Sequence, residues 1–597
     1  MVESGRQRAG CLSWKTFFEP RDTSGAGYGF RIYFQDTGFA NKAFMKSKRK
    51  IVHRVIGLCL GLAGVAAVCA GPTFAQVGTE GLTSPKGELQ GAGGQDVRGQ
   101  EARAAQARFA RRVDEVLGSE TVRRGEWGVE VMDAATGDVL YERDADKYFV
   151  PASNMKLLTT ALALDKLGVE YRFRTTVETN GKLGTDGVLA GDLILVGRGD
   201  PNLSNRKFPF ETKEEFDGLP DRVISELADA VVARGVKEIS GDIVGDDSYF
   251  PRERYPDGWE IGDMVWEYGA AISAIVVNDN TVTLTLTPGE RAGEPVTDSV
   301  EPATAEFTVK NLVVTSKTGE KADLRLTREP GSESVVVTGT MPARATPRKL
   351  LLAIQEPAQH AASMLAKLLA ERGVKFHGKI RAMHEPDGPG VVRTVLAEHM
   401  SLRLEDTVKL VNKISQNLHT EVLLRTAARQ QGVWATPEDL TKFPEEFYVR
   451  AGIPLGDVVQ VDGSGLSRQD MVTPRAFVAL LQFAQRQAWF PAYYASLPVA
   501  GADGTLNERM KAGVLTGRIH AKTGSVTHVR ALSGYAETPG GRRLIFSFLA
   551  NNQSGNNHEA HDALDGLCLA MVQEFDVVPS VTGAAGGKVQ WLGRRER

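Results

Sequence analysis

The sequence predicts an α/β fold of the α+β kind, in which a five-stranded antiparallel sheet flanked by helices is interrupted by a mostly β insertion. The first observation is a pair of strand-like segments around the turn Thr136-Gly137. The second is a set of three strand-like segments near the C-terminus, at 518–526, 530–537 and 542–551. The third is a change of texture between them, where short Val/Thr/Leu strands alternate with Gly/Asp turns from 177 to 397. An insertion that divides one domain is the simplest account of this order.

Three segments predict the helices that flank the sheet. Residues 100–119 have the spacing of an amphipathic helix, a second helix runs from Ser153 to near Gly168, and a third spans 559–574. Residues 1–44 precede a complete export signal and look like a mis-assigned upstream extension. The remaining organisation is a signal at 45–75, a linker at 76–100, a divided α/β domain at 101–176 and 398–576, an insertion of one or two small domains at 177–397, and a flexible tail at 577–597.

The composition is that of a globular protein long enough for more than one domain, with 597 residues, 42% hydrophobic and 24% charged. A formal charge of −3 gives no electrostatic case for nucleic acid as a partner. Of the four cysteines, Cys11, Cys59 and Cys69 lie in or before the predicted signal. The mature protein would keep Cys568 alone, which excludes an internal disulfide and a cysteine metal site.

The N-terminal region predicts an export signal at 45–75. Met45 opens a basic segment, residues 55–70 are apolar or small, and Thr73 and Ala75 fit cleavage after Ala75. An uncleaved membrane anchor is the alternative, but the apolar run is shorter than the ~20 residues that a span needs. We therefore expect an exported protein of the periplasm or cell envelope, with no stable membrane span after cleavage.

Ser153 and Lys156 form the first candidate site. Residues three apart share one face of a helix, so Lys156 can reach the Ser153 hydroxyl. A serine is a poor nucleophile unless a base removes its proton, and a lysine serves only when burial or a second cation lowers its pKa. The alternative is a helix cap beside a surface lysine, and the same Ser-x-x-Lys pattern occurs at Ser47 and Ser204.

Order and context distinguish the functional patterns from chance copies. Residues 415–417 read Ser-Gln-Asn and interrupt a helical stretch, and residues 522–524 read Lys-Thr-Gly at the end of a predicted strand. A second Lys-Thr-Gly at Lys317 precedes Ser415 and is typical of a charged hairpin turn. We therefore expect the set that begins at Ser153 to act together.

This ordered triplet resembles the penicillin-recognising serine enzymes, namely penicillin-binding proteins, DD-peptidases and serine β-lactamases. Five further segments are similar to the D-alanyl-D-alanine carboxypeptidase/endopeptidase family: GDLILVGRGDPNLS, GDIVGDDSYF, DGSGLSRQDMVTP, LPVAGADGTLNERM and AKTGSVTHVRALSGYAE. These are low-molecular-mass penicillin-binding proteins with extra domains inserted between the first two motifs. The resemblance covers about 103–575, and it implies that the divided domain is a catalytic domain of the β-lactamase/transpeptidase type.

The resemblance implies the roles of four catalytic residues. Ser153 would attack the carbonyl between two terminal D-alanines and form an acyl-enzyme, with Lys156 as the general base. Ser415 would relay the proton to the leaving amine, and Asn417 would hold Lys156 and the substrate amide. β-Lactam antibiotics would be covalent inhibitors at the same serine.

The resemblance also implies substrate-binding residues. Lys522 would place a second cation in the site, lower the pKa of Lys156 and attract the C-terminal carboxylate, which the hydroxyls of Thr523 and Ser525 would bind. Gly524 would allow close approach of the backbone. The N–H groups of Ser153 and Ser525 would form the oxyanion hole.

Three more residues are candidates for contact with the substrate's side chain: Arg468 and, by the same resemblance, Trp259 and Asp263 in the insertion. Ordinary structural roles are the alternative for all three. The segment 558–562, HEAHD, is similar to a zinc-protease helix, but its histidines are three residues apart rather than four, which favours a solvated helix start. We predict no cofactor and no metal site.

The predicted function is that of an exported serine DD-peptidase acting on peptidoglycan stem peptides. It would trim a terminal D-alanine or cut D-alanyl cross-links, and the sequence leaves that choice open. A serine β-lactamase is one alternative, although we identify no group that would drive water onto the acyl-enzyme. A non-hydrolytic penicillin sensor or wall-binding protein is another, and it would normally need a membrane span or signalling domain.

Overall fold

The computed structural model describes residues 92–204, 206, 219–302, 307–511, 513–554 and 557–576. The predicted upstream extension, the signal at 45–75, most of the predicted linker and the tail at 577–597 lie outside these residues. The first helix, α2 (Ala92–Leu117), begins within the segment predicted as linker, so the amphipathic helix starts earlier than its sequence pattern indicates.

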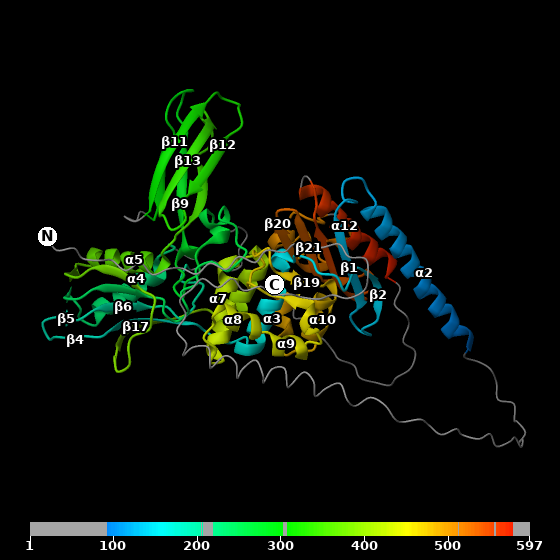
Figure 1. Cartoon of the computed structure of the whole chain (residues 1–597), viewed down its shortest axis with the longest axis horizontal. Helices are drawn as coiled ribbons and strands as arrows, with labels where there is room; N and C mark the ends of the chain where they lie inside the picture. The colour runs from blue at the N-terminus through cyan, green and yellow to red at the C-terminus, as the bar shows by residue number, and fades with distance from the viewer. Residues whose placement is uncertain are drawn as a thin grey trace, which may run out of the picture. The chain divides into compact units, whose positions relative to one another are not determined.

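The two ends of the described chain build one five-stranded antiparallel sheet, as predicted (Figure 1). Its strand order is β2-β1-β22-β21-β20, so the N-terminal hairpin pairs with the last strand rather than with its sequence neighbours. The strands are β1 (Glu126–Asp133), β2 (Val139–Arg143), β20 (Ile519–Val526), β21 (Val529–Glu537) and β22 (Arg543–Asn551).

Both faces of this sheet are covered, because its strands alternate apolar side chains between two cores. Tyr535 and Ile545 point into one core with the helices around α3 (Met155–Leu167) and α10 (Pro474–Ala484). Leu532 and Phe546 point into the other core, against α2 and α12 (Asn557–Glu574). The divided α/β domain is thus a sheet between two helical layers. Its remaining helices are α6 (Leu404–Ile414), α7 (Asn417–Gln430), α8 (Pro437–Lys442), α9 (Glu445–Arg450) and α11 (Phe490–Ser496).

The insertion leaves and rejoins the divided α/β domain through two neighbouring strands. β3 (Arg174–Thr179) begins it, β17 (Thr394–Met400) ends it, and the two strands pair antiparallel. The predicted boundaries at 176/177 and 397/398 each fall inside one of these strands. The chain therefore leaves the divided α/β domain and returns to it at adjacent positions, so the insertion does not separate the two halves of that domain.

The first part of the insertion is a mixed α/β unit rather than purely β. Its two sheets have the orders β16-β8-β6-β3-β17 and β15-β7-β5-β4, with parallel neighbours such as β6 and β8. Parallel strands need crossover connections, and α4 (Arg222–Ala233) and α5 (Pro357–Glu371) pack on them. The other strands are β4 (Lys182–Leu183), β5 (Val188–Ala190), β6 (Leu193–Val196), β7 (Glu238–Ile239), β8 (Ile243–Asp246), β15 (Lys375–Phe376) and β16 (Ile380–Met383).

The second part of the insertion is all β and contains two three-stranded sheets, β10-β9-β14 and β11-β13-β12. Lys317 lies between β11 and β12, which are separated in their sheet by β13, so the predicted hairpin turn is wrong and this Lys-Thr-Gly is a strand crossover. The strands are β9 (Thr281–Thr287), β10 (Thr297–Glu301), β11 (Thr308–Ser316), β12 (Asp323–Arg328), β13 (Ser334–Pro342) and β14 (Arg348–Ala353).

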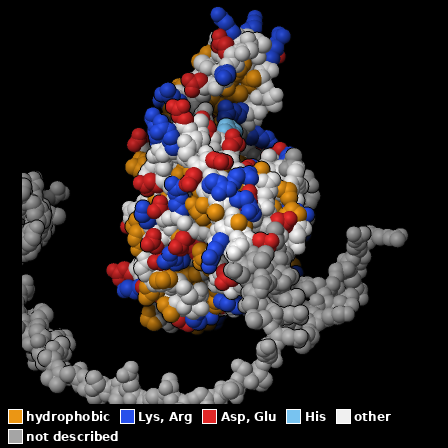
Figure 2. Space-filling view, turned by 90° about the vertical axis from the view of Figure 1, so that its right-hand side faces the viewer, with side chains coloured by type: hydrophobic (Ala, Val, Ile, Leu, Met, Phe, Trp, Pro, Cys, Tyr) orange, Lys and Arg blue, Asp and Glu red, His pale blue; other side chains and the backbone are white. Residues whose placement is uncertain are grey.

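The described surface carries charges of both signs. On the face in Figure 2, acidic and basic side chains are interspersed, with hydrophobic side chains among them. Within the described ranges, no helix has both the length and the apolar character of a membrane span.

Leu564 of α12 tests the layer formed by α2 and α12. It is fully buried in the core beneath the sheet, so Leu564→Ala should lower the free energy of unfolding by about 2–5 kcal/mol in urea denaturation. Val139→Ala, at a residue 43% exposed on β2, is the control and should change it by less than about 0.5 kcal/mol. Equal effects of the two changes would contradict this packing.

Candidate active site

Ser153 lies on a single 3₁₀ turn (Ala152–Asn154) that leads directly into α3. The residue preceding α3 is Asn154, and no side-chain hydrogen bond caps the helix there. The Ser153 hydroxyl is instead within 2.9 Å of the Lys156 amine. This contact favours the predicted serine–lysine pair over the alternative of a simple helix cap.

Lys156 is fully buried, and its amine contacts oxygens from three segments of the chain. Besides Ser153 Oγ, the side-chain carbonyl of Asn417 and the main-chain carbonyl of Ser464 each lie 2.6 Å from Nζ. The side-chain amide of Asn417 in turn donates to the carbonyl of Tyr268 at 2.8 Å. The insertion, which carries Tyr268, therefore orients a residue that touches the lysine.

The Ser-Gln-Asn segment is the junction between two helices, which explains the polar interruption in its helical pattern. Ser415 ends α6 in the left-handed region at φ 62°, and the Gln416 side chain accepts from the His419 N–H at the start of α7. A non-glycine residue in this conformation carries backbone strain of roughly 1–3 kcal/mol. The strained turn holds Ser415 and Asn417 close to both lysines of the site.

Lys522 on β20 is also fully buried and contacts this turn from the other side. Its Nζ lies 2.9 Å from Ser415 Oγ and 2.8 Å from the carbonyl oxygen of Thr523. The Thr523 hydroxyl is 2.7 Å from that of Thr505. The three separate sequence motifs thus meet in one site.

Two glycines permit the close packing around the Ser153 turn. A Cβ at Gly524 would lie 2.6 Å from the carbonyl oxygen of Pro151, and a Cβ at Gly465 would collide with that of Ala152. Gly465 also has φ 78°, a conformation that side chains disfavour. Strand β20 and the loop around Gly465 therefore hold the turn from two sides.

A cavity of about 440 Å³ opens over these groups. It brings the predicted residues Ser153, Ser415, Asn417, Thr523 and Ser525 together with Arg468 and Asp263. Trp259 is not among the described residues that line it. Its side chain is buried, and the indole N–H donates to Asp462 Oδ2 at 2.8 Å, which favours the structural alternative for this residue.

The structure adds wall residues that the sequence analysis missed, among them Tyr268, Thr505, Arg509 and His561. His561 belongs to the HEAHD segment, where a solvated helix start was expected, and it is only partly exposed. Burial, with Arg509 and other cations nearby, lowers the pKa of His561 to about 4, so the ring is neutral at pH 7. The histidine-rich segment was the feature of the sequence that could have drawn attention to His561. Its place in the cavity wall depends on how α12 packs, which the segment itself does not reveal.

The cavity wall carries charges of both signs. Glu260, Asp263 and Arg468 belong to it, and Arg468 Nε is 3.7 Å from Glu260 Oε1. Burial, reinforced by Glu260, raises the pKa of Asp263. Arg509 also lines the cavity, and its guanidinium is held by Asp565. Among the residues described, no group of three or more His, Cys, Asp or Glu side chains is arranged to hold a metal ion.

The model of the D-Ala-D-Ala carboxypeptidase 3 (S13) family matches residues 109–571. The chain belongs to this family. It is 35% identical over 454 residues to a D-alanyl-D-alanine carboxypeptidase of Actinomadura sp., covering 74% of this chain and 81% of that protein. It is 26% identical over 434 residues to the carboxypeptidase DacB of Haemophilus influenzae, covering 71% of this chain and 84% of that protein.

A crystal structure of penicillin binding protein 4 from Haemophilus influenzae has the same fold, with a TM-score of 0.68 at 24% identity over 78% of this chain and 99% of that one. The predictions of the family, the fold class and a D-Ala-D-Ala carboxypeptidase enzyme are thereby confirmed. In this carboxypeptidase, the long insertion supplies Asp263 and Tyr268 to the same cavity as Ser153.

Gly465 provides a test of the packing around the nucleophile turn. Gly465→Ala should displace the Ala152 carbonyl and reduce acylation by a fluorescent penicillin at least roughly tenfold per folded molecule, because small misplacements in an active site are costly. Gly456→Ala is the matched control, since it has no positive φ and a Cβ there meets nothing within 4 Å. Unaltered acylation in Gly465→Ala would remove this constraint from the site.

Proposed function

We propose that this carboxypeptidase acts through a Ser153 acyl-enzyme on peptidoglycan stem peptides and is inhibited covalently by β-lactams. The observation that carries the proposal is the 2.9 Å contact between Ser153 Oγ and the buried amine of Lys156. A hydroxyl becomes an effective nucleophile when such a base receives its proton.

The surroundings of Lys156 support a role as general base. A neutral amine has two N–H bonds and one lone pair. The carbonyl oxygens of Asn417 and Ser464 accept the two N–H bonds, so the lone pair faces the Ser153 hydroxyl. Burial in a low-dielectric interior favours the neutral amine over the ammonium form.

The groups around Ser415 and Lys522 fit the D-alanine that departs. Ser415 lies between Lys522 and the cavity, and it relays the proton from Lys156 to the leaving amine. The Lys522 cation attracts the terminal carboxylate, which the hydroxyls of Thr523 and Ser525 bind. The N–H groups of Ser153 and Ser525 receive the oxyanion, an interaction of roughly 3 kcal/mol per donor in comparable enzymes.

Elsewhere in the cavity, Arg468 and Asp263 bind the side chain of the stem-peptide residue before the two D-alanines, and Trp259 supports the loop behind them.

The enzyme is exported to the periplasm or cell envelope, where peptidoglycan lies, as the basic and apolar segments at 45–75 predict. A second crystal structure of the Haemophilus influenzae protein contains a β-lactam, in keeping with β-lactams as inhibitors.

The nucleophile is tested by mass spectrometry after incubation with benzylpenicillin. We expect one stable adduct on the peptide that contains Ser153, and none in Ser153→Ala. Ser204, the other serine of a Ser-x-x-Lys pattern in the described chain, is buried and should stay unmodified. An adduct at a different residue, or none on the folded protein, would refute the assignment.

Paired turnover separates the peptidase from a β-lactamase and from a sensor. After cleavage of a D-alanyl peptide, the departed D-alanine leaves room for water, so this acyl-enzyme should hydrolyse quickly. The leaving group of a penicillin stays tethered to the acyl group and blocks water, so that adduct should persist.

The measurement is steady-state turnover of a D-Ala-D-Ala pentapeptide, a cross-linked dimer and benzylpenicillin by one preparation. Peptide turnover with slow penicillin release is the expected result, and the dimer separates endopeptidase from carboxypeptidase activity. Faster penicillin hydrolysis would indicate a β-lactamase, and lasting acylation without peptide cleavage would indicate a sensor.

A further inference from the structure

The loop that contains Ser464 contacts both α3 and α7. It lies between the short strands β18 (Val458–Val459) and β19 (Met471–Val472). Two successive carbonyls of this loop face α3: Ser464 O accepts from the Lys156 amine at 2.6 Å, and Gly463 O accepts from the Thr159 hydroxyl at 2.7 Å. Lys156 and Thr159 are three residues apart, so one face of α3 holds both carbonyls.

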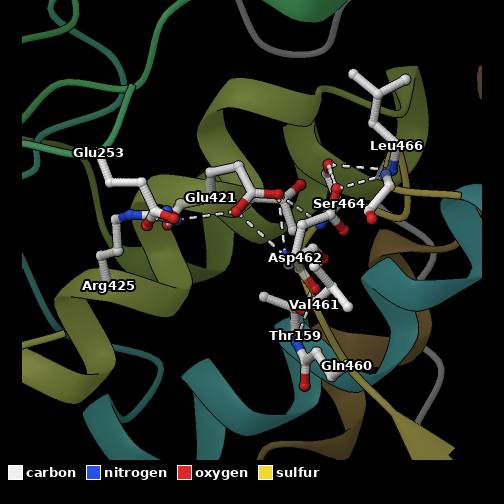
Figure 3. A network of polar contacts seen from close by, with 12 residues as sticks. Thr159, Glu253, Glu421, Arg425, Gln460, Val461, Asp462, Ser464 and Leu466 are labelled. Carbon is white, nitrogen blue, oxygen red and sulfur yellow. Dashed lines mark hydrogen bonds and ion pairs between the residues drawn. The ribbon is translucent and has the colours of Figure 1, made fainter. Parts of the chain in front are cut away.

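The N–H groups of the same two residues face α7 and bind a single carboxylate. Glu421 accepts from the Ser464 N–H at 2.7 Å and from the Gly463 N–H at 3.0 Å (Figure 3). Its side chain is completely buried. Glu421 lies one helical turn after Asn417, whose carbonyl contacts the Lys156 amine directly.

We propose that Glu421 is a positioning residue for acylation, which fixes the Ser464 carbonyl and thereby aims the Lys156 amine at Ser153. The inference rests on the proposed function and deepens it. Helix α7 then sets both carbonyl partners of the amine, one through Asn417 and one through the loop. The roles that the resemblance implies include Asn417 and leave Glu421 without one.

The groups around Glu421 require an ionised carboxylate. Two backbone N–H groups and the Arg425 guanidinium, at 2.9 Å, are all donors, so a glutamine amide would turn a donor toward at least one of them. Arg425 also contacts Glu253 at 3.0 Å, which keeps the arginine paired. The loop is held further by Asp462, which accepts from the Gly465 and Ser467 N–H groups at 2.6 and 2.8 Å.

The charges facing Glu421 determine the pH at which this arrangement holds. Burial first, and then the Asp462 carboxylate, raise the pKa of Glu421 to about 7, while Arg425 acts in the opposite direction. Asp470 lies behind Asp462, and burial with the Asp462 charge raises its pKa well above the usual value. The ionised carboxylate of Glu421, which only accepts hydrogen bonds, therefore prevails only above neutral pH.

The test is Glu421→Gln in the full chain, with acylation by a fluorescent penicillin followed by stopped flow at about pH 8.5. Burst titration counts the active sites, so that the limiting acylation rate constant is obtained per competent molecule. We expect this rate constant to fall roughly 10- to 100-fold, since a misaimed base slows the chemical step, while the apparent dissociation constant stays within about twofold. Glu421→Asp should recover part of the loss.

The ratio of the wild-type acylation rate constant to that of Glu421→Gln, measured over a range of pH, distinguishes positioning from a merely structural role. The wild-type enzyme also loses the Glu421 charge on acidification, so its advantage over Glu421→Gln should narrow as pH falls below about 7. Removal of a buried negative charge also changes the pKa of a nearby amine, so the protonation of Lys156 is fitted separately for each protein. The matched control is Glu178→Gln, which removes another buried, arginine-paired carboxylate in the insertion. The ratio of the wild-type rate constant to that of Glu178→Gln should be one at each pH.

An unchanged rate constant per active site in Glu421→Gln, with only fewer sites, would overturn the proposal, and so would a rate ratio independent of pH.

If Glu421→Gln does not fold, Thr159→Val replaces it as the test. It removes the other anchor of the loop with little change in volume and should lower the same rate constant several-fold. An unaltered rate constant in Thr159→Val would then overturn the proposal. Failure of the underlying function would look different, because the wild-type enzyme would form no adduct at Ser153.

Discussion

The site depends on one buried amine, that of Lys156. Its position is determined by three pieces of chain that are distant in sequence: the turn before α3, the start of α7 and the loop at Ser464. A displacement of any of them changes the distance to the Ser153 hydroxyl. The packing of the two helical layers on the sheet can therefore be understood as the support for this contact.

The same constraint explains how the insertion and the sheet are connected to the site. The insertion reaches Lys156 through the Tyr268 carbonyl and Asn417, and the sheet reaches Ser415 through Lys522. Because β20 lies at the edge of the sheet, its outer side is available to the cavity. An insertion placed between the first two motifs thus extends the cavity wall without interrupting the sheet.

Much of this could be predicted from local patterns. The five strands have alternating or continuous apolar runs, and the three motifs have a fixed order, so the sheet and the Ser153–Asn417–Lys522 set were accessible. The parallel strands of the insertion were not, since short apolar segments such as β6 and β8 do not reveal their partners. Ser464 contributes through its backbone carbonyl, which no side-chain pattern marks. Trp259 was placed on the substrate side by resemblance, and only its contact with Asp462 shows where it lies.

A comparison among buried lysines shows why Glu421 contacts the loop rather than the amine. Lys413, at the end of α6, lies 2.6 Å from both oxygens of Asp503, and although burial lowers the pKa of Lys413 overall, this carboxylate acts in the opposite direction. The contacts of Lys156 described above are carbonyl and hydroxyl oxygens, which favour an ammonium less strongly than a carboxylate does. The Gly463–Ser464 peptide lies between Glu421 and the amine, so that the carboxylate contacts the Ser464 N–H group and the amine contacts the Ser464 carbonyl. A carboxylate in direct contact would hold the amine equally well, but it would stabilise the ammonium form, in which Lys156 could not act as the proposed general base.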